Sequence, residues 1–169
     1  ADHGLTMAKI AGAISEAVDA AEGGIQSMLD DAAMAVMTLN GGSAVPLWNT
    51  WLDGLQEEAP EGEEIDVAGL KAIFAKALEE LEDMSGAKVG DKTMMDALIP
   101  ASEAVAAYTG DSADELFDAA AQAAAQGAEA TKQYVSKFGR AKSYGTKTIG
   151  TPDAGAVSMS WFFQGLARE

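Results

Sequence analysis

The stretch from Asp66 to Gly86, DVAGLKAIFAKALEELEDMSG, decides the fold class of this chain. Its apolar residues recur three and four positions apart, which places them on one face of an α-helix. Asp66 predicts the N-cap, because its side chain can accept one of the free N–H groups of the first turn. Ser85-Gly86 predicts the end of the helix. The apolar face consists of Val67, Leu70, Ile73, Phe74, Ala77, Leu78, Leu81 and Met84.

The rest of the chain shows similar apolar spacing, interrupted by connections that contain Gly or Pro. Ser112 and Glu115 form a capping-box pattern at the start of a long Ala-rich helix. No pair of strands is indicated, so we expect an all-α fold in which the helices close into a barrel or bundle of antiparallel neighbours. Besides the helix after Asp66, six more are expected over about 5–21, 25–39, 46–55, 92–108, 112–137 and 155–167, with a long loop over 138–154.

Composition restricts the function classes. The chain has 169 residues, 11 basic and 27 acidic, for a formal net charge of −16. Bulk charge therefore argues against nucleic acid or an anionic membrane as partner, and the many carboxylates make a divalent metal plausible. Cysteine is absent, and neither a run of about 18 apolar residues nor a signal peptide is visible. We expect one domain over residues 1–169, in the cytoplasm.

Four segments could carry chemistry, and each also has a purely structural interpretation. Asp2-His3-Gly4 could be a helix N-cap, and Asn40 to Ser43 could be a simple turn. Gly86 to Asp96 is a loop that leads into a helix. There Lys92 opposes the helix dipole unless something negative is bound, which favours a ligand over a structural cap only slightly. Gly139 to Gly155 could be a solvated surface loop, although structureless loops of this length are usually functional.

The fourth segment holds much of the positive charge of the chain. In a chain this acidic, a local cluster of cations is the best candidate for contact with an anion. The cluster comprises Lys137, Arg140, Lys142 and Lys147.

Taken together, the segments resemble one family, the nucleotide-binding L subunit or domain of dihydroxyacetone kinases. The resemblance covers essentially the whole chain, and its most specific parts are the GDKTM segment and the segments that follow it. The matching motifs, in chain order, are Ala1 to Gly4, Gly41-Gly42, Gly90 to Met94, Gly139 to Ala141, Ile149-Gly150 and Asp153 to Gly155.

This resemblance implies a barrel of eight antiparallel amphipathic helices that holds a nucleotide at one rim. Seven helices are expected here, so the chain is expected to be incomplete at its N-terminus, without the helix that precedes Asp-His-Gly in the family. The family also binds two magnesium ions through three aspartates, in the pattern D-x4-D-x-D-H-G. Only Asp2 matches that set, as the third aspartate.

The resemblance also implies the nucleotide contacts. Arg140 matches an arginine on the phosphate side and is the expected catalytic residue. The hydroxyl of Ser43 is displaced by one position from the usual serine, and Ala154 stands where the family often has proline. The expected contacts are His3, Gly4, Leu5, Thr6, Ser43, Ala44, Gly86, Met94, Arg140, Asp153, Ala154 and Gly155.

The implied function is that of a kinase subunit that binds ADP or ATP with Mg²⁺. It would act only with a K subunit, which holds dihydroxyacetone or a related ketose. The phosphoryl donor is either exchangeable ATP or a bound ADP that a phosphoenolpyruvate-dependent phosphotransferase protein recharges, and some relatives of this family phosphorylate a fatty acyl group instead. The alternative from another class is a non-catalytic helical module that binds a nucleotide or lipid and regulates a partner protein.

Overall fold

The structure, a computed structural model, describes residues 2–168, and the regular secondary structure of that part of the chain is entirely helical, without a β-strand. The prediction of an all-α chain is confirmed, and so is the count of seven α-helices over these residues. Ala1, the first residue of the matched N-terminal motif, lies outside them. The helices are α1 (Asp2–Ala20), α2 (Ile25–Met37), α3 (Ala44–Glu57), α4 (Val67–Ser85), α5 (Met95–Ala107), α6 (Ala113–Ala130) and α7 (Ala154–Ala167), with 3-10 segments η1 (Thr131–Gln133) and η2 (Arg140–Thr148).

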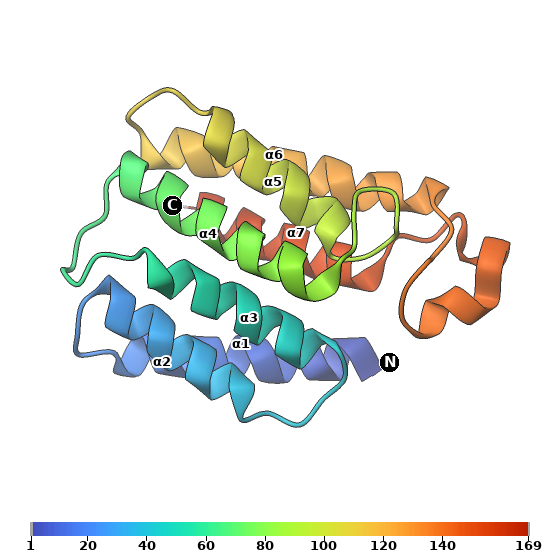
Figure 1. Cartoon of the computed structure of the whole chain (residues 1–169), viewed down its shortest axis with the longest axis horizontal. Coiled ribbons are helices and arrows are strands. Elements are labelled where there is room, and N and C mark those ends of the chain that lie inside the picture. The colour runs from blue at the N-terminus through green and yellow to red at the C-terminus, as the bar shows by residue number, and fades with distance from the viewer. Residues whose placement is uncertain (1, 169) are drawn as a thin grey trace. The chain divides into compact units, whose positions relative to one another are not determined.

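The chain divides into two compact units, unit 1 up to Ser85 and unit 2 from Gly86 onward. The single domain expected over residues 1–169 stays a prediction. In unit 1, α3 packs against both α2 and α4, and α1 packs against α2 (Figure 1). The core contains two tryptophans of α3, and the Trp51 ring lies 6.1 Å from that of Phe74 on α4. Gly54 lets these two helices approach closely, because a Cβ there would lie 2.7 Å from the Cα of Ala77.

Unit 2 is built on α5, α6 and α7, which pack against one another (Figure 1). Its core includes Leu98, Leu116, Met159 and Phe163, all fully buried. Gly127 of α6 lies directly against the carbonyl oxygen of Asp96, so that an added Cβ would collide with it. Pro100, which lies inside α5, has no N–H to donate to this carbonyl.

The caps predicted at Asp66 and Ser112 are confirmed, whereas α5 has Met94 and not Asp91 as its N-cap. The N–H of Gly69 donates to Asp66 Oδ1 at 2.7 Å, and α4 runs from Val67 to Ser85 as expected. The N–H of Glu115 donates to Ser112 Oγ at 3.3 Å at the start of α6. The starts of these two helices depend on residues within one turn of the cap, which explains why they can be predicted from the sequence.

Three predictions in unit 2 were wrong. The helix expected from Lys92 begins at Met95, because Lys92 has a left-handed φ of 63° and cannot be helical. The Ala-rich helix expected to reach Lys137 ends at Ala130, and only the short η1 follows it. The loop expected over 138–154 contains η2, which is interrupted at Gly145 with a φ of 54°.

No helix within residues 2–168 combines the length and the hydropathy that crossing a bilayer requires.

Candidate functional site

The loop that follows Gly86 is held in place by Asp91. Its carboxylate accepts from the N–H of Lys88 and from Lys137 Nζ, both at 2.8 Å. Its carbonyl accepts from the N–H of Lys137 at 3.1 Å, so the two segments are joined by both backbone and side chains. The hydrogen bond from Lys137 is the main reason why the pKa of Asp91 lies below its usual 3.8, and the bond from Lys88 adds to it.

Asp96 orders the second half of the same loop. Its carboxylate is almost completely buried and accepts from the N–H groups of Gly90 and Thr93, each at 2.7 Å. This carboxylate lies in the first turn of α5, where the helix dipole also favours a negative charge. Hydrogen bonds to Asp91 and Asp96 therefore fix the two halves of the loop before α5.

Lys92 is the centre of this part of unit 2. Its side chain crosses to three backbone carbonyls and donates from Nζ to Thr131 at 2.8 Å and to Thr148 and Thr151 at 2.6 Å. Only 5% of the residue is exposed. Burial lowers the pKa of this lysine from 10.5, while the negative charges of Asp153 and Asp96 act in the opposite direction.

An ammonium group has three N–H donors, so the three carbonyls use all of them. The sequence placed Lys92 in the first turn of a helix, whereas it precedes α5 and its positive charge is bound by the protein itself. That the loop from Gly86 to Asp96 faces a ligand stays a prediction.

The three carbonyls belong to a folded loop with bonds of its own. Thr131 Oγ1 accepts from the N–H of Asp153 at 2.8 Å. The N–H of Gly150 donates to the carbonyl of Lys132 at 2.7 Å. Thr148 Oγ1 accepts from the N–H of Ser136 at 3.1 Å and donates to the carbonyl of Gly145 at 2.8 Å. The end of α6, the end of η2 and the start of α7 are thereby tied together.

Four expected nucleotide contacts lie together at the start of α7. Asp153 is the N-cap, and its Oδ2 accepts from the N–H of Ala156 at 2.9 Å. A Cβ on Gly155 would lie 3.3 Å from the Cβ of Met94 and 3.5 Å from its backbone N. The structure thus brings Met94, Asp153, Ala154 and Gly155 together, although Met94 comes from a distant part of the sequence.

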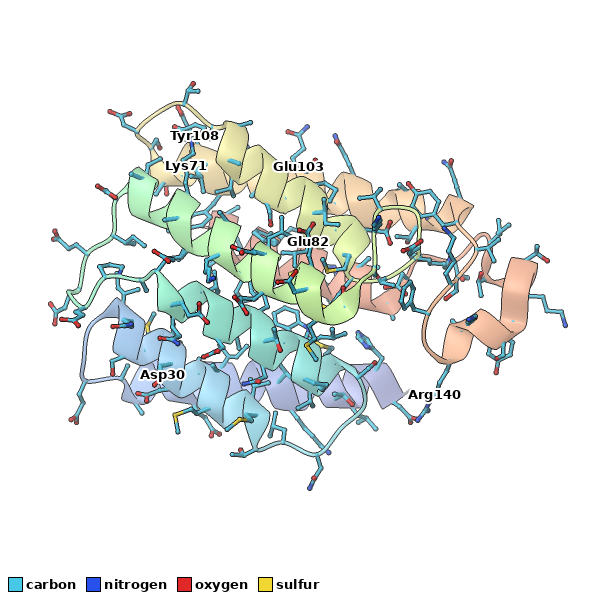
Figure 2. The ribbon with its side chains drawn as sticks, viewed as in Figure 1. Asp30, Lys71, Glu82, Glu103, Tyr108 and Arg140 are labelled. Carbon is cyan, nitrogen blue, oxygen red and sulfur yellow. The ribbon has the colours of Figure 1, made fainter. Side chains whose placement is uncertain are left out.

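Arg140 lies at the beginning of η2 and is exposed. Figure 2 shows its side chain pointing away from α5 and α6. It follows Gly139, whose φ is 63° and where an added Cβ would have no neighbour within 4 Å. Gly86, Gly90 and Gly150 have the same combination of a positive φ and open space around the Cβ position. Ligands can approach the backbone closely at such glycines.

Unit 1 contains the second group of expected site residues. Gly41 lies against Thr6, since an added Cβ would be 2.9 Å from Thr6 Cγ2. The glycine turn and the start of α1 are therefore neighbours, as the expected site requires. Ser43 is exposed and is the N-cap of α3, although its side chain makes no capping hydrogen bond. The remaining expected residues here, Asp2, His3, Gly4 and Leu5, lie in the first two turns of α1, and Ala44 is the first residue of α3.

Residues 2–168 contain no group of three or more His, Asp or Glu side chains that could hold a metal ion. Asp2 is the single described carboxylate at the expected metal position. Mg²⁺ is commonly held by one or two carboxylates together with phosphate oxygens and water. The described residues therefore do not form the expected two-ion site, and Asp2 could bind an ion only with help from a phosphate or from further ligands.

Sequence reasoning singled out Lys92 without finding its role, and it missed Asp96 and Thr131, which also fix the loops of unit 2. The local conflict at Lys92 was visible, but its resolution depends on carbonyls 39, 56 and 59 positions further along the chain. No local pattern reports such contacts.

The fold and these loops define a helical module with a glycine-rich, pre-ordered loop cluster. The model of the DAK2 domain matches residues 1–168, and the chain belongs to this family. The resemblance to the dihydroxyacetone kinase L subunit is thereby confirmed.

Named relatives make the comparison more specific. The chain is 35% identical to the L-erythrulose kinase of Pectobacterium atrosepticum over 98% of its own length and 29% of that protein. It is 28% identical to the ADP-binding subunit DhaL of the PEP-dependent dihydroxyacetone kinase of Escherichia coli, over 99% of the chain and 81% of the relative. The chain thus spans under a third of the erythrulose kinases and most of the DhaL subunit.

A solved dihydroxyacetone kinase of C. freundii has a similar fold. In its native form it superposes with a TM-score of 0.61 at 25% identity, over 84% of this chain and 23% of the other. A second structure of that kinase, in complex with AMP-PNP and Mg²⁺, gives a TM-score of 0.62 at 22% identity, over 98% of this chain and 33% of the other. The latter likeness concerns the fold alone.

Proposed function

We propose that this chain is the nucleotide-binding module of a ketose kinase of the dihydroxyacetone kinase type. It holds ADP or ATP and passes a phosphoryl group to a short ketose that a K-type partner subunit or domain binds. The observation that carries this proposal is the close approach of Met94 to Gly155 in unit 2, where a Cβ added to Gly155 would lie 3.3 Å from the Cβ of Met94. These are two of the residues that the resemblance assigns to the nucleotide.

We assign the residues of unit 2 as follows. Gly86 and Met94 flank the base and ribose, and Asp153, Ala154 and Gly155 form the last nucleotide loop. Arg140 contacts the phosphates. In unit 1, His3, Gly4, Leu5, Thr6, Ser43 and Ala44 are assigned to the nucleotide, and Asp2 to Mg²⁺. The second Mg²⁺ ion and its ligands rest on the resemblance alone.

Phosphoryl transfer needs positioning and stabilisation of negative charge more than covalent chemistry by the protein. The guanidinium of Arg140 supplies a fixed positive charge and a planar set of donors that matches phosphate oxygens. The sequence has one histidine, His3, which lies in the segment assigned to the nucleotide. No residue of this chain is assigned to the ketose, so the proposal places the group that binds and activates the ketose on the partner.

The names of the relatives support a ketose of three or four carbons, because they specify dihydroxyacetone and erythrulose. The E. coli relative is named PEP-dependent, whereas the names of the erythrulose kinases specify no phosphoryl donor. We keep ATP and a phosphoenolpyruvate-dependent phosphotransferase protein as alternative donors. The cytoplasmic location expected from the sequence stays a prediction.

A reconstituted transfer assay tests the proposal. The full-length protein is mixed with a K-type partner, dihydroxyacetone or D- or L-erythrulose, and either ATP or a phosphoenolpyruvate-dependent phosphoryl donor system. We expect sugar phosphate with at least one donor, and none when either protein is omitted or when glycerol replaces the ketose. Absence of transfer under every combination, together with absence of nucleotide binding, would contradict the proposal.

A further inference from the structure

We propose that Lys92 is a positioning residue for nucleotide binding, whose ammonium group sets the shape of the loop that carries Arg140 and the Asp153 to Gly155 turn. The inference rests on the proposed function. It concerns a residue that neither the resemblance nor the names of the relatives assign to the site.

The geometry separates Lys92 from a residue that touches the ligand. Its three N–H donors end on the carbonyls of Thr131, Thr148 and Thr151, at 2.6–2.8 Å, so none is left for a phosphate. Hydrogen bonds from a charged donor are stronger than neutral ones, and burial keeps water from competing for them. Any effect on a nucleotide must therefore pass through the loop.

Each of the three carbonyls belongs to a residue that shares a segment with a proposed contact or is hydrogen-bonded to one. Thr148 is the last residue of η2, which begins at Arg140. Thr151 lies two residues before Asp153, and Thr131 accepts the N–H of Asp153 on its own hydroxyl. One buried cation thus joins the segment of the phosphate contact to the segment of the last nucleotide loop.

The backbone conformation of Lys92 also indicates that its side chain has a specific function. Its φ of 63° is the one positive value at a non-glycine residue within residues 2–168. Such a conformation is unfavourable for a residue with a Cβ and persists where the surroundings enforce it, which happens preferentially at functional sites. Glycine would adopt the same φ without strain, so a side chain at this position has to contribute more than a turn.

The first experiment compares Lys92→Met with Leu116→Ala. Leu116 is fully buried near the start of α6, whereas Thr131 follows the other end of that helix, so Leu116→Ala lowers stability without touching the loops. Binding of ADP with Mg²⁺ to the full-length protein is measured by calorimetry at a temperature where both variants are folded. We expect Lys92→Met to weaken binding roughly tenfold to a hundredfold, as supporting residues of a site commonly do, and Leu116→Ala to leave it unchanged.

The outcomes separate this inference from the proposed function. If the wild type does not bind ADP, both the proposed function and the positioning role of Lys92 are contradicted. If the wild type binds and Lys92→Met binds equally well, the positioning role is refuted while the function stands. The same holds if Leu116→Ala weakens binding as much as Lys92→Met does, because the effect would then follow stability alone.

Hydrogen exchange without nucleotide gives a second readout. We expect Lys92→Met to speed exchange at the N–H groups of Gly150 and Asp153, which are bonded to Lys132 and Thr131. Leu116→Ala should not single out these groups. Unchanged protection of both N–H groups in Lys92→Met would contradict the proposed control of the loop.

Chemical rescue tests the role of the ammonium itself. Lys92→Gly relieves the backbone and leaves space for butylammonium, which has the carbons and the charge of the missing side chain. We expect butylammonium to restore part of the lost ADP affinity, and tetramethylammonium at equal ionic strength to restore none, because it has no N–H donors. Equal recovery with both cations would show that only bulk charge matters and would overturn the assignment of the hydrogen bonds.

Discussion

Arg140 is the single side chain that the proposal assigns to the phosphates. Replacing Arg140 with Met keeps much of the apolar stem and removes the guanidinium. We expect the affinity for the Mg²⁺–nucleotide complex, or the rate of phosphoryl transfer, to fall by an amount that corresponds to about 1.5–3 kcal/mol, the range for hydrogen bonds to charged groups. Thermal stability without ligand should change little, because Arg140 is exposed.

Lys142→Met is the matched control for this variant. It removes one positive charge from an exposed position in the same η2 segment. If both variants weaken binding equally, the effect is one of general charge and Arg140 makes no specific contact. If Arg140→Met lowers the melting temperature by many degrees and leaves binding intact, the residue is structural.

Asp91 gives a prediction about pH. Its folded-state pKa lies below the ordinary 3.8, because Lys137 and the N–H of Lys88 stabilise the charged form. Its contribution to stability is therefore complete well above pH 3.8 and is lost as the pH falls through the folded pKa. We expect Asp91→Asn to lower the free energy of unfolding by about 1 kcal/mol at pH 7. Urea unfolding of both proteins from pH 7 to pH 2 checks this, and a difference that persists undiminished at pH 2 would rule out the carboxylate as its origin.

At the scale of the elements, the contact between α5 and α6 depends on Gly127. A Cβ there would collide with the carbonyl of Asp96, so Gly127→Ala must push the helices apart. We expect it to destabilise the protein by about 1–3 kcal/mol, the usual cost of overpacking. Gly165→Ala on α7 is the control, because no atom lies within 4 Å of its added Cβ and alanine is the better helix former. An equal change of the melting temperature in both variants would show that the close approach of α5 and α6 at Gly127 does not limit stability.

The elements also show what the sequence can and cannot predict. Apolar spacing and the caps at Asp66 and Ser112 depend on neighbours along the chain, and both predicted helix starts are confirmed. The start of α5 was misplaced because the left-handed turn at Lys92 is enforced by carbonyls of a distant loop. The segment from Arg140 to Thr148 is rich in Gly, Ser and Thr, which predicts a loop, yet short 3-10 turns can form from such residues.

The candidate site divides in the same way. The order of motifs predicted a set of nucleotide residues, and the structure places Met94 near Gly155 and Thr6 near Gly41. The sequence contains no signal for the three carbonyls that accept from Lys92, because every residue type has the same backbone carbonyl. Assignment of individual contacts to a nucleotide stays a prediction.

For the molecule as a whole, the net charge affects whether a nucleotide can bind without a cation. A chain with a formal charge of −16 repels a polyphosphate, so binding should require a divalent cation to offset the charge. Asp2 is the one described carboxylate assigned to that cation, and residues 2–168 form no metal cluster without further ligands. Affinity for free nucleotide is therefore expected to be weak.

Calorimetric titration of the full-length protein with ADP, in Mg²⁺ and again in EDTA, tests the central claim most directly. We expect saturable binding of one ADP in Mg²⁺ and an affinity at least about tenfold lower in EDTA, a difference of 1.4 kcal/mol or more. Equal affinity in both buffers would show that Mg²⁺ does not contribute to nucleotide binding. No binding of ADP or ATP in Mg²⁺ would contradict the claim that this chain is a nucleotide-binding kinase module.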